Sequence, residues 1–123
     1  MYKKTKMHNG DVIVKKPWGQ YTDIFRSGEV VFKQIIINAG EEISLQTHNL
    51  RDECWFISSG VGYLTIGSQK FFVTAGQSFF INKKTKHQIK NDGPKQLVIF
   101  EMQMGLCQEE DIVRYEDKYG RIE

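Results

Sequence analysis

The chain has 123 residues, enough for one hydrophobic core and too few for two. Its 17 Lys and Arg residues against 15 Asp and Glu residues leave a formal net charge of +2, which argues against the strongly basic surface of a nucleic-acid-binding protein. No window approaches the roughly 20 apolar residues of a membrane span, and no apolar run follows the basic N-terminus. We expect no nucleic-acid or membrane partner, a flexible leader at 1–11 and a single domain at 12–123.

The two cysteines carry information about the compartment. Cys54 and Cys107 show neither CxxC pairing nor metal-knuckle spacing. Free thiols of this kind fit a reducing environment. The sequence therefore predicts a cytoplasmic protein.

Short β-branched and aromatic segments separated by turn residues follow the leader. Strands are predicted at 12–14, 30–37, 43–48, 53–57, 61–66, 69–73, 78–81, 87–90 and 96–104. Pro17 and Gly19 mark a bend whose aromatic residues, Trp18 and Tyr21, cover one end of the core. Many short strands with turn signals about every ten residues indicate an all-β sandwich or barrel. The tail at 109–123 departs from this pattern, and one helical turn is predicted there.

Four polar side chains in this β pattern form a candidate metal site. Gln46 and His48 are two residues apart on one strand, so they point the same way. Glu53 follows on the next strand, and His87 opens a later one. Together they offer nitrogen and oxygen ligands for a divalent ion, with zinc as the first expectation and Mn, Fe, Co or Ni as alternatives. Each residue alone also fits an ordinary strand or surface position.

The spacing of these residues resembles the first motif of the cupin family. Five residues separate Gly40 from Gln46, which occupies the slot of the motif's leading His. His48 follows after one residue, Glu53 after four more, and Gly60 after six more. Only one motif position is therefore substituted.

The second cupin motif is matched in spacing. Gly76 is followed at the motif's intervals by His87 and Asn91, while Asn82 and Lys84 stand in its Pro and Gly slots. This resemblance implies an all-β fold of the cupin type, a double-stranded antiparallel β-barrel or jelly roll. It also implies that the four candidate ligands share one ion.

Longer strings resemble one branch of cupins, the type II mannose-6-phosphate isomerase domain, which is often fused behind a mannose-1-phosphate guanylyltransferase. These strings are P-W-G at 17–19, S-L-Q-x-H-x-x-R-x-E-x-W at 44–55, E-x-Q at 101–103 and E-D-I-V-R-x-E-D-x-Y-G-R at 110–121. In this branch Gln replaces the leading His of the first motif, as Gln46 does here. The resemblance implies metal-dependent isomerisation of mannose 6-phosphate to fructose 6-phosphate, a step that feeds GDP-mannose and polysaccharide synthesis. No guanylyltransferase activity is expected, because the chain shows no glycine-rich phosphate-binding loop.

The isomerase reading also suggests roles for residues beyond the metal ligands. Glu101 is the candidate general base, with Gln103 facing the same side as a substrate contact. Arg51 is predicted, like Glu101, to be a catalytic residue. It is also a candidate for holding the phosphate. The other cations considered for the phosphate are Lys86, Arg114 and Arg121. A surface cation is the alternative reading for each.

Departures from the branch keep other functions open. The branch usually has His where this chain has Asn49, Leu50 and Cys54, and Arg where it has Gln88. Strand parity turns Cys54 away from Glu53, so the change there should not remove a ligand. The altered positions leave two alternatives, a non-catalytic cupin that binds a sugar, sugar phosphate or sugar nucleotide, and a cupin enzyme acting on another carbohydrate.

Three outward strand residues, Phe56, Phe72 and Phe80, predict more apolar surface than one small barrel can cover. A second copy of the chain would cover such a surface. We therefore expect a homodimer.

Overall fold

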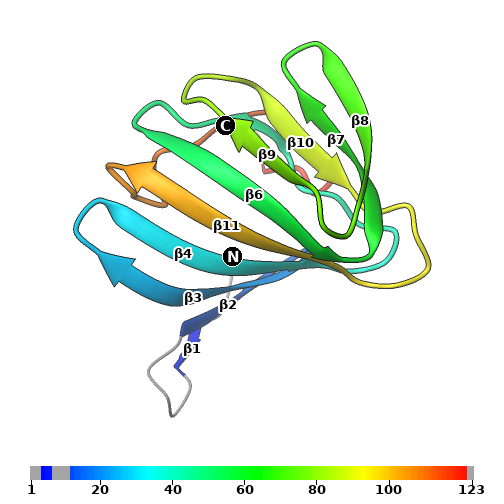
Figure 1. Cartoon of the computed structure of the whole chain (residues 1–123), viewed down its shortest axis with the longest axis horizontal. Helices are drawn as coiled ribbons and strands as arrows, with labels where there is room; N and C mark the ends of the chain where they lie inside the picture. The colour runs from blue at the N-terminus through cyan, green and yellow to red at the C-terminus, as the bar shows by residue number, and fades with distance from the viewer. Residues whose placement is uncertain (1–3, 7–11, 122–123) are drawn as a thin grey trace.

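The computed structural model describes residues 4–6 and 12–121, and within them every regular element is a strand (Figure 1). The strands are β1 (Lys4–Lys6), β2 (Val12–Lys16), β3 (Gly19–Ser27), β4 (Val30–Ile37), β5 (Leu45–Thr47), β6 (Arg51–Ser59), β7 (Val61–Ile66), β8 (Gln69–Thr74), β9 (Ser78–Ile81), β10 (His87–Lys90), β11 (Leu97–Gly105) and β12 (Val113–Glu116). The all-β prediction is confirmed. The described part of the chain contains no helix of the length and apolarity needed to cross a bilayer.

The described strands form two antiparallel sheets. The larger has seven strands in the order β1-β2-β3-β4-β11-β6-β9, and the smaller has five in the order β12-β5-β10-β7-β8. In Figure 1 the larger sheet crosses the view, and β7, β8 and β10 lie to its right. Some neighbouring strands, such as β4 and β11, are far apart in sequence. Pairing between distant segments therefore joins the hairpins into sheets.

Alternating burial along the strands places the core between the two sheets. Along β4 the residues alternate between partly exposed and buried, as a strand with one face on a core requires. The larger sheet contributes Ile37, Trp55 and Ile99 to this core, and the smaller contributes Leu64 and Ile89. These apolar side chains hold the two sheets together at one end of the barrel.

Two segments differ from the sequence prediction. The bend at 16–21 is a tight β2–β3 hairpin, and β3 extends well beyond it. Gly19 is required at this turn because its φ is +151° and a Cβ atom there would lie 2.0 Å from the carbonyl oxygen of Ile36. The helical turn predicted in the tail is wrong, since 113–116 form β12 on the edge of the smaller sheet.

The expected leader, 1–11, contains one described strand. β1 pairs in antiparallel register with β2, which places Lys4 opposite Val14. The remaining leader residues, 1–3 and 7–11, lie outside the described residues. Cys54 and Cys107 are both free thiols, as expected.

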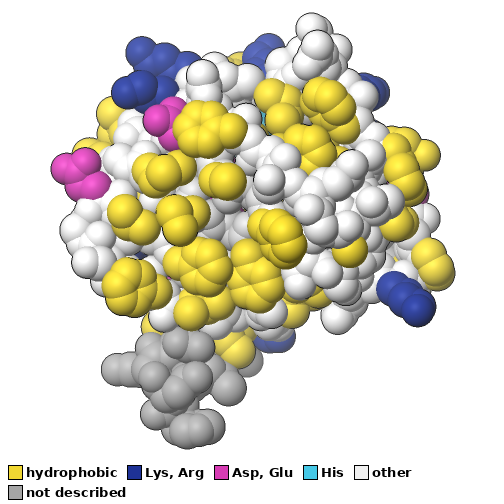
Figure 2. Space-filling model, in the orientation of Figure 1, with side chains coloured by type: hydrophobic (Ala, Val, Ile, Leu, Met, Phe, Trp, Pro, Cys, Tyr) yellow, Lys and Arg dark blue, Asp and Glu magenta, His cyan; other side chains and the backbone are white. Residues whose placement is uncertain are grey.

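An apolar row crosses the outer face of the larger sheet. Successive pairs join residues of β3, β4, β11, β6 and β9, in the order Phe25, Phe32, Met102, Cys54 and Phe80. Figure 2 shows hydrophobic side chains gathered over this face. We call this surface the outer apolar face. Phe56 and its partner Phe100 lie two positions from Cys54 and Met102 and so share this face, whereas the third expected residue, Phe72, lies on β8 of the other sheet.

Candidate metal and substrate site

The inner face of the larger sheet changes from apolar to charged along its strands. Residues directly opposite each other on antiparallel strands share a face. Glu101 of β11 lies opposite Trp55 of β6, and two positions further along Gln103 lies opposite Glu53. The period of two that buries the core isoleucines therefore also buries these polar groups, together with Arg51 at the start of β6.

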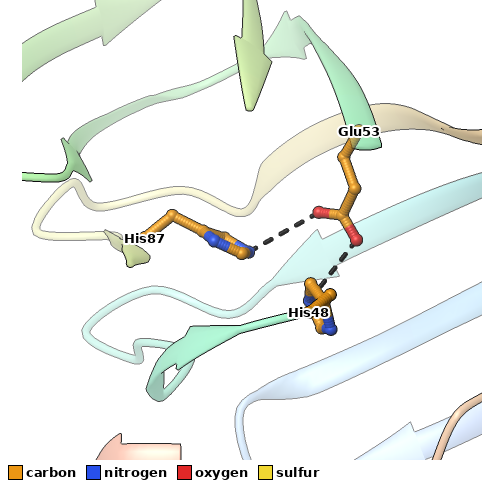
Figure 3. Close-up of side chains that lie close together, drawn as sticks. All are labelled: His48, Glu53 and His87. Atoms are coloured by element: carbon orange, nitrogen blue, oxygen red, sulfur yellow. Dashed lines mark ion pairs between the residues drawn. The ribbon is translucent and has the colours of Figure 1, made fainter. Parts of the chain in front are cut away.

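His48, Glu53 and His87 converge from three places in the chain. His48 follows β5, Glu53 lies on β6 and His87 opens β10, and all three are buried. The Nε2 atom of His48 is 3.4 Å from Oε2 of Glu53, and that of His87 is 3.5 Å from Oε1 (Figure 3). One ligand atom from each residue lies within 4.8 Å of the other two. Three of the four predicted ligands therefore meet at one point.

Backbone contacts fix how the two imidazoles face this point. Nδ1 of His48 donates to the carbonyl oxygen of Asp111 at 2.7 Å, and Nδ1 of His87 donates to that of Thr85 at 2.9 Å. Burial lowers the pKa of both rings, that of His48 to about 4, so both are neutral near pH 7. Their Nε2 lone pairs are thus directed at the carboxylate of Glu53.

The guanidinium of Arg51 serves two of these acceptors, since its Nη2 donates to Nε2 of His48 at 3.3 Å and its Nε donates to Oε2 of Glu53 at 2.8 Å. The buried Nε2 of His87 has no hydrogen-bond partner among the described residues, and an unpartnered buried acceptor is costly. Two imidazole nitrogens and a carboxylate suit a divalent ion that prefers nitrogen and oxygen ligands. The residues present therefore fit a divalent metal ion, held by His48, Glu53 and His87.

Gln46, the fourth predicted ligand, lies beside this cluster. It pairs directly with His87 across the β5–β10 ladder and lines the same cavity. Its Oε1 accepts a hydrogen bond from the hydroxyl of Ser44 at 3.3 Å. Gln46 therefore neighbours His87 in the ladder and lines the cavity, with its Oε1 engaged by Ser44.

Glu101 is a second buried carboxyl group in the site. Its Oε2 accepts from the indole Nε1 of Trp55 at 2.8 Å, and its Oε1 accepts from Nε2 of Gln103 at 2.8 Å. Burial, followed by the nearby carboxylate of Glu53, raises the pKa of Glu101 to about 7. A carboxyl group held rigidly with such a pKa can both accept and return a proton near neutral pH.

Arg51 is paired within the cluster. Its Nε donates to Oε2 of Glu53 at 2.8 Å, and its Nη1 donates to the carbonyl oxygen of Gln108 at 3.2 Å. Burial opposes the charge of Arg51, but the carboxylates of Glu53 and Glu101 outweigh it and raise its pKa. The guanidinium therefore balances the acidic groups of the site.

A cavity of about 650 Å³ opens beside these groups. Its lining includes the predicted residues Gln46, His48, Arg51, Glu101, Gln103, Arg114 and Arg121. Lys86 is not among the described residues that line it, and its Nζ instead lies 4.3 Å from the centre of the Tyr115 ring. The phosphate contact considered for Lys86 in the sequence therefore has no support from its position.

Several site residues were not foreseen as such. Trp55 links the two carboxyl groups, since its Nε1 also donates to Oε1 of Glu53 at 3.1 Å. Lys16 and Lys33 line the cavity. In the sequence, Lys16 is one of several basic residues near the N-terminus, and Lys33 stands in a predicted strand of mainly apolar residues. The alternation of side chains along a strand could have indicated both lysines, because each lies two residues from a buried apolar residue and so points to the same side.

The chain is similar in sequence to proteins of bacterial polysaccharide synthesis and to a guanylyltransferase. The chain is 38% identical over 109 residues to the xanthan biosynthesis protein XanB of Xanthomonas campestris and, over the same length, to the alginate biosynthesis protein AlgA of Pseudomonas aeruginosa. It is 33% identical over 110 residues to the mannose-1-phosphate guanylyltransferase ManC of Salmonella typhimurium. Each match covers 88–89% of this chain and 23% of the relative. The chain thus spans about a quarter of the length of these relatives.

Solved structures confirm the fold. The capsular polysaccharide assembling protein CapF from Staphylococcus aureus superposes with a TM-score of 0.78 at 15% identity, over 86% of this chain and 34% of CapF. A cupin protein from Bacteroides fragilis superposes with a TM-score of 0.59 at 22% identity, over 64% of this chain and 68% of that protein. The two sheets are therefore those of a cupin-type double-stranded β-barrel.

One family profile covers nearly the whole chain. It is described as "Mannose-6-phosphate isomerase C-terminal" and matches residues 3–117. The match includes both halves of the proposed metal site and the strand β12. The chain belongs to the family of mannose-6-phosphate isomerase C-terminal domains.

Proposed function

We propose that this domain is a metal-dependent aldose–ketose isomerase that interconverts mannose 6-phosphate and fructose 6-phosphate. The observation that carries the proposal is the position of Glu101, a carboxyl group with a pKa near 7, in the cavity that His48 of the His48, Glu53 and His87 cluster also lines. Family membership supports the choice of substrate. A divalent ion held by the cluster would act as a Lewis acid toward adjacent substrate oxygens.

The reaction moves one proton from C2 to C1 and a second from the C2 hydroxyl to the C1 carbonyl oxygen, and we assign the transfer between the carbons to Glu101. Its ionised carboxylate would take the proton from one carbon and return it to the next. The hydrogen bonds from Trp55 and Gln103 hold the carboxylate in one orientation throughout. Trp18 and Tyr21 line the cavity and limit the access of water to the reacting carbons.

The test is an isomerase assay on the purified chain loaded in turn with Zn²⁺, Mn²⁺, Co²⁺, Fe²⁺ or Ni²⁺. We expect interconversion of mannose 6-phosphate and fructose 6-phosphate in both directions, and loss of turnover on chelation. Binding of sugars or sugar nucleotides by calorimetry without turnover for any ion would replace the isomerase with a binding module. Turnover of another carbohydrate alone would keep the enzyme class and change the substrate. The free thiols of Cys54 and Cys107 support a cytoplasmic setting for the reaction.

We also propose that the chain forms a homodimer through the outer apolar face. Phe25, Phe56 and Phe80 are each about half exposed, and Met102 nearly so. Half of a phenylalanine side chain offers about 100 Å², so Phe25, Phe56 and Phe80 supply about 300 Å². This would form the apolar centre of a standard interface of roughly 800 Å² per partner. A two-fold axis would match the face to itself.

Two aspartate substitutions test the dimer. Phe56→Asp places a charge on the outer apolar face and should convert the dimer to monomer at micromolar concentration, because an unpaired charge in an apolar interface is strongly unfavourable. Phe72→Asp introduces the same change at a residue of similar exposure on the other sheet and should leave the dimer intact. Sedimentation velocity separates the two states. A wild-type chain that is monomeric under these conditions contradicts the proposal.

A further inference from the structure

Three cations from distant parts of the chain meet at one side of the cavity. Lys16 ends β2, Arg114 lies on β12 and Arg121 follows β12, and all three line the cavity. Lys16 shares the strand face of Val14, which is buried in the core, whereas its neighbour Lys15 is exposed and bonds to Gln20. The strand therefore turns the two lysines to opposite sides.

Strand register places Arg114 at a defined distance from the metal cluster. His87 lies opposite Gln46, and Gln46 lies opposite Arg114, so the three residues form one row across β10, β5 and β12. Neighbouring strands are about 4.8 Å apart, which separates the backbones of His87 and Arg114 by about 10 Å. The cavity thus has a metal end and a cationic end on a single sheet face.

Cations outnumber carboxylates in this part of the cavity lining, with Lys16, Lys33, Arg114 and Arg121 against Glu109 and Glu110. Lys33 is neutralised by its ion pair with Glu109, and Arg121 is held by two hydrogen bonds to the carboxylate of Asp117 at 2.8 Å. The pKa of Lys16 is lowered to about 8, first by burial and then, against the attraction of Glu109, by three neighbouring cations. Lys16 remains mostly protonated at pH 7, in a repulsive field that a bound anion would relieve.

We propose that Lys16 and Arg114, flanked by Arg121, form the subsite for the phosphate group of the substrate. This inference rests on the proposed function, because it assigns one end of the same cavity to the phosphate of a hexose 6-phosphate. The carbonyl end of the sugar would then lie at His48, Glu53 and His87. A guanidinium can grip two phosphate oxygens at once, and the lysine adds a point charge.

The assignment differs from the sequence expectation for physical reasons. Arg51 already spends its donors on Glu53 and on the carbonyl oxygen of Gln108. Lys86 lies on the ring of Tyr115 and does not line the cavity. Lys16 lines the cavity, and the charges that act on it include those of Arg114 and Arg121, the other two cations of the subsite.

The test uses Lys16→Met and Arg114→Met in the metal-loaded chain, with Lys15→Met as the matched control. Methionine keeps the apolar stem of each side chain and removes its charge. Calorimetry with inorganic phosphate and with fructose 6-phosphate should show affinities reduced about 10- to 100-fold in the first two variants, the usual effect of losing a hydrogen bond to a charged group. Lys15→Met should stay within about twofold of wild type.

The kinetic signature is a rise in KM for mannose 6-phosphate with little change in kcat. Lys16→Arg keeps the charge and should retain affinity, which separates the loss of charge from a folding defect. Equal phosphate affinity in wild type and the two methionine variants would overturn the subsite, even if the enzyme turns over. Phosphate binding that depends on Lys16 without any turnover would instead keep the subsite and overturn the isomerase.

Discussion

Replacing His87 by alanine should empty the metal site and abolish turnover. The substitution removes one of three converging ligand atoms and leaves Glu53 and His48 without the geometry to hold an ion. Loss of Lewis-acid stabilisation is worth several kcal/mol, so we expect turnover to fall by at least about 10³-fold. Metal content measured by mass spectrometry should fall from about one ion per chain to a small fraction.

Cys54→Ser is the matched control for this experiment. Cys54 offers a thiol, a strong metal ligand by residue type, and is next to Glu53 in sequence. It lies opposite Phe80 on the outer apolar face, so its sulfur points away from the cluster. The serine variant should keep its full metal content and activity. A drop in metal content in Cys54→Ser, or unchanged metal content in His87→Ala, would contradict the ligand assignment.

The sequence was most informative where burial alternates with period two. Burial alternates along β4, β6, β7 and β11, and these strands were predicted with boundaries within two residues of those observed. β3 was not foreseen because its second half is exposed and a bulge after Asp23 interrupts the register. Local patterning therefore sufficed for strands with one face on the core and failed for an exposed one.

The tail shows where local reasoning reaches its limit. Residues 109–121 are mostly charged and have no apolar alternation, so the segment gave no strand signal. β12 forms because β5 offers an edge, and this pairing joins residues such as Val113 and Thr47 that are far apart in sequence. The position of Arg114 in the cavity follows from that contact, which the segment alone does not encode.

The metal cluster was foreseen because spacing and parity act together with a resemblance. Gln46 and His48 had to share a face, and a short turn had to bring Glu53 beside them. The tautomers of the two histidines were not foreseeable, since they depend on the carbonyl oxygens of Asp111 and Thr85. The sequence also could not show which Lys and Arg side chains face the cavity, because that depends on how distant strands pack together.

The departures from the family pattern lie away from the cavity. Gln88 faces opposite to His87 on β10, and its Nε2 donates to the carbonyl oxygen of Ile43 at 3.1 Å. The backbone N–H groups of Asn49 and Leu50 donate to the carboxylate of Asp111. None of the three is among the described residues that line the cavity. Gln88 therefore bears on the contact between β10 and Ile43, and Asn49 and Leu50 bear on the loop before β6.

Replacing Glu101 by glutamine should lower kcat by about 10²- to 10⁴-fold, the usual contribution of a general base, with little change in KM. The fold should accommodate the amide. Oε1 of Gln103 is buried without a hydrogen-bond partner among the described residues, so a flip of the Gln103 amide lets it accept from the new NH₂ group. Metal content should stay unchanged, and exchange of the substrate's carbon-bound proton with deuterated water should be lost. Glu110→Gln, in the lining of the same cavity, should retain turnover.

The pH profile gives an independent test of the same carboxyl group. Glu101 acts as a base only when ionised, and burial with the neighbouring carboxylate of Glu53 raises its pKa to about 7. A cation at the cluster opposes that shift, so kcat/KM of the wild-type enzyme should rise with pH along a limb centred at or below about 7. The limb should disappear in Glu101→Gln, because the amide does not titrate. If Glu101→Gln keeps the wild-type rate and the same pH dependence of kcat/KM, Glu101 is not the general base. Another residue of the cavity must then move the proton.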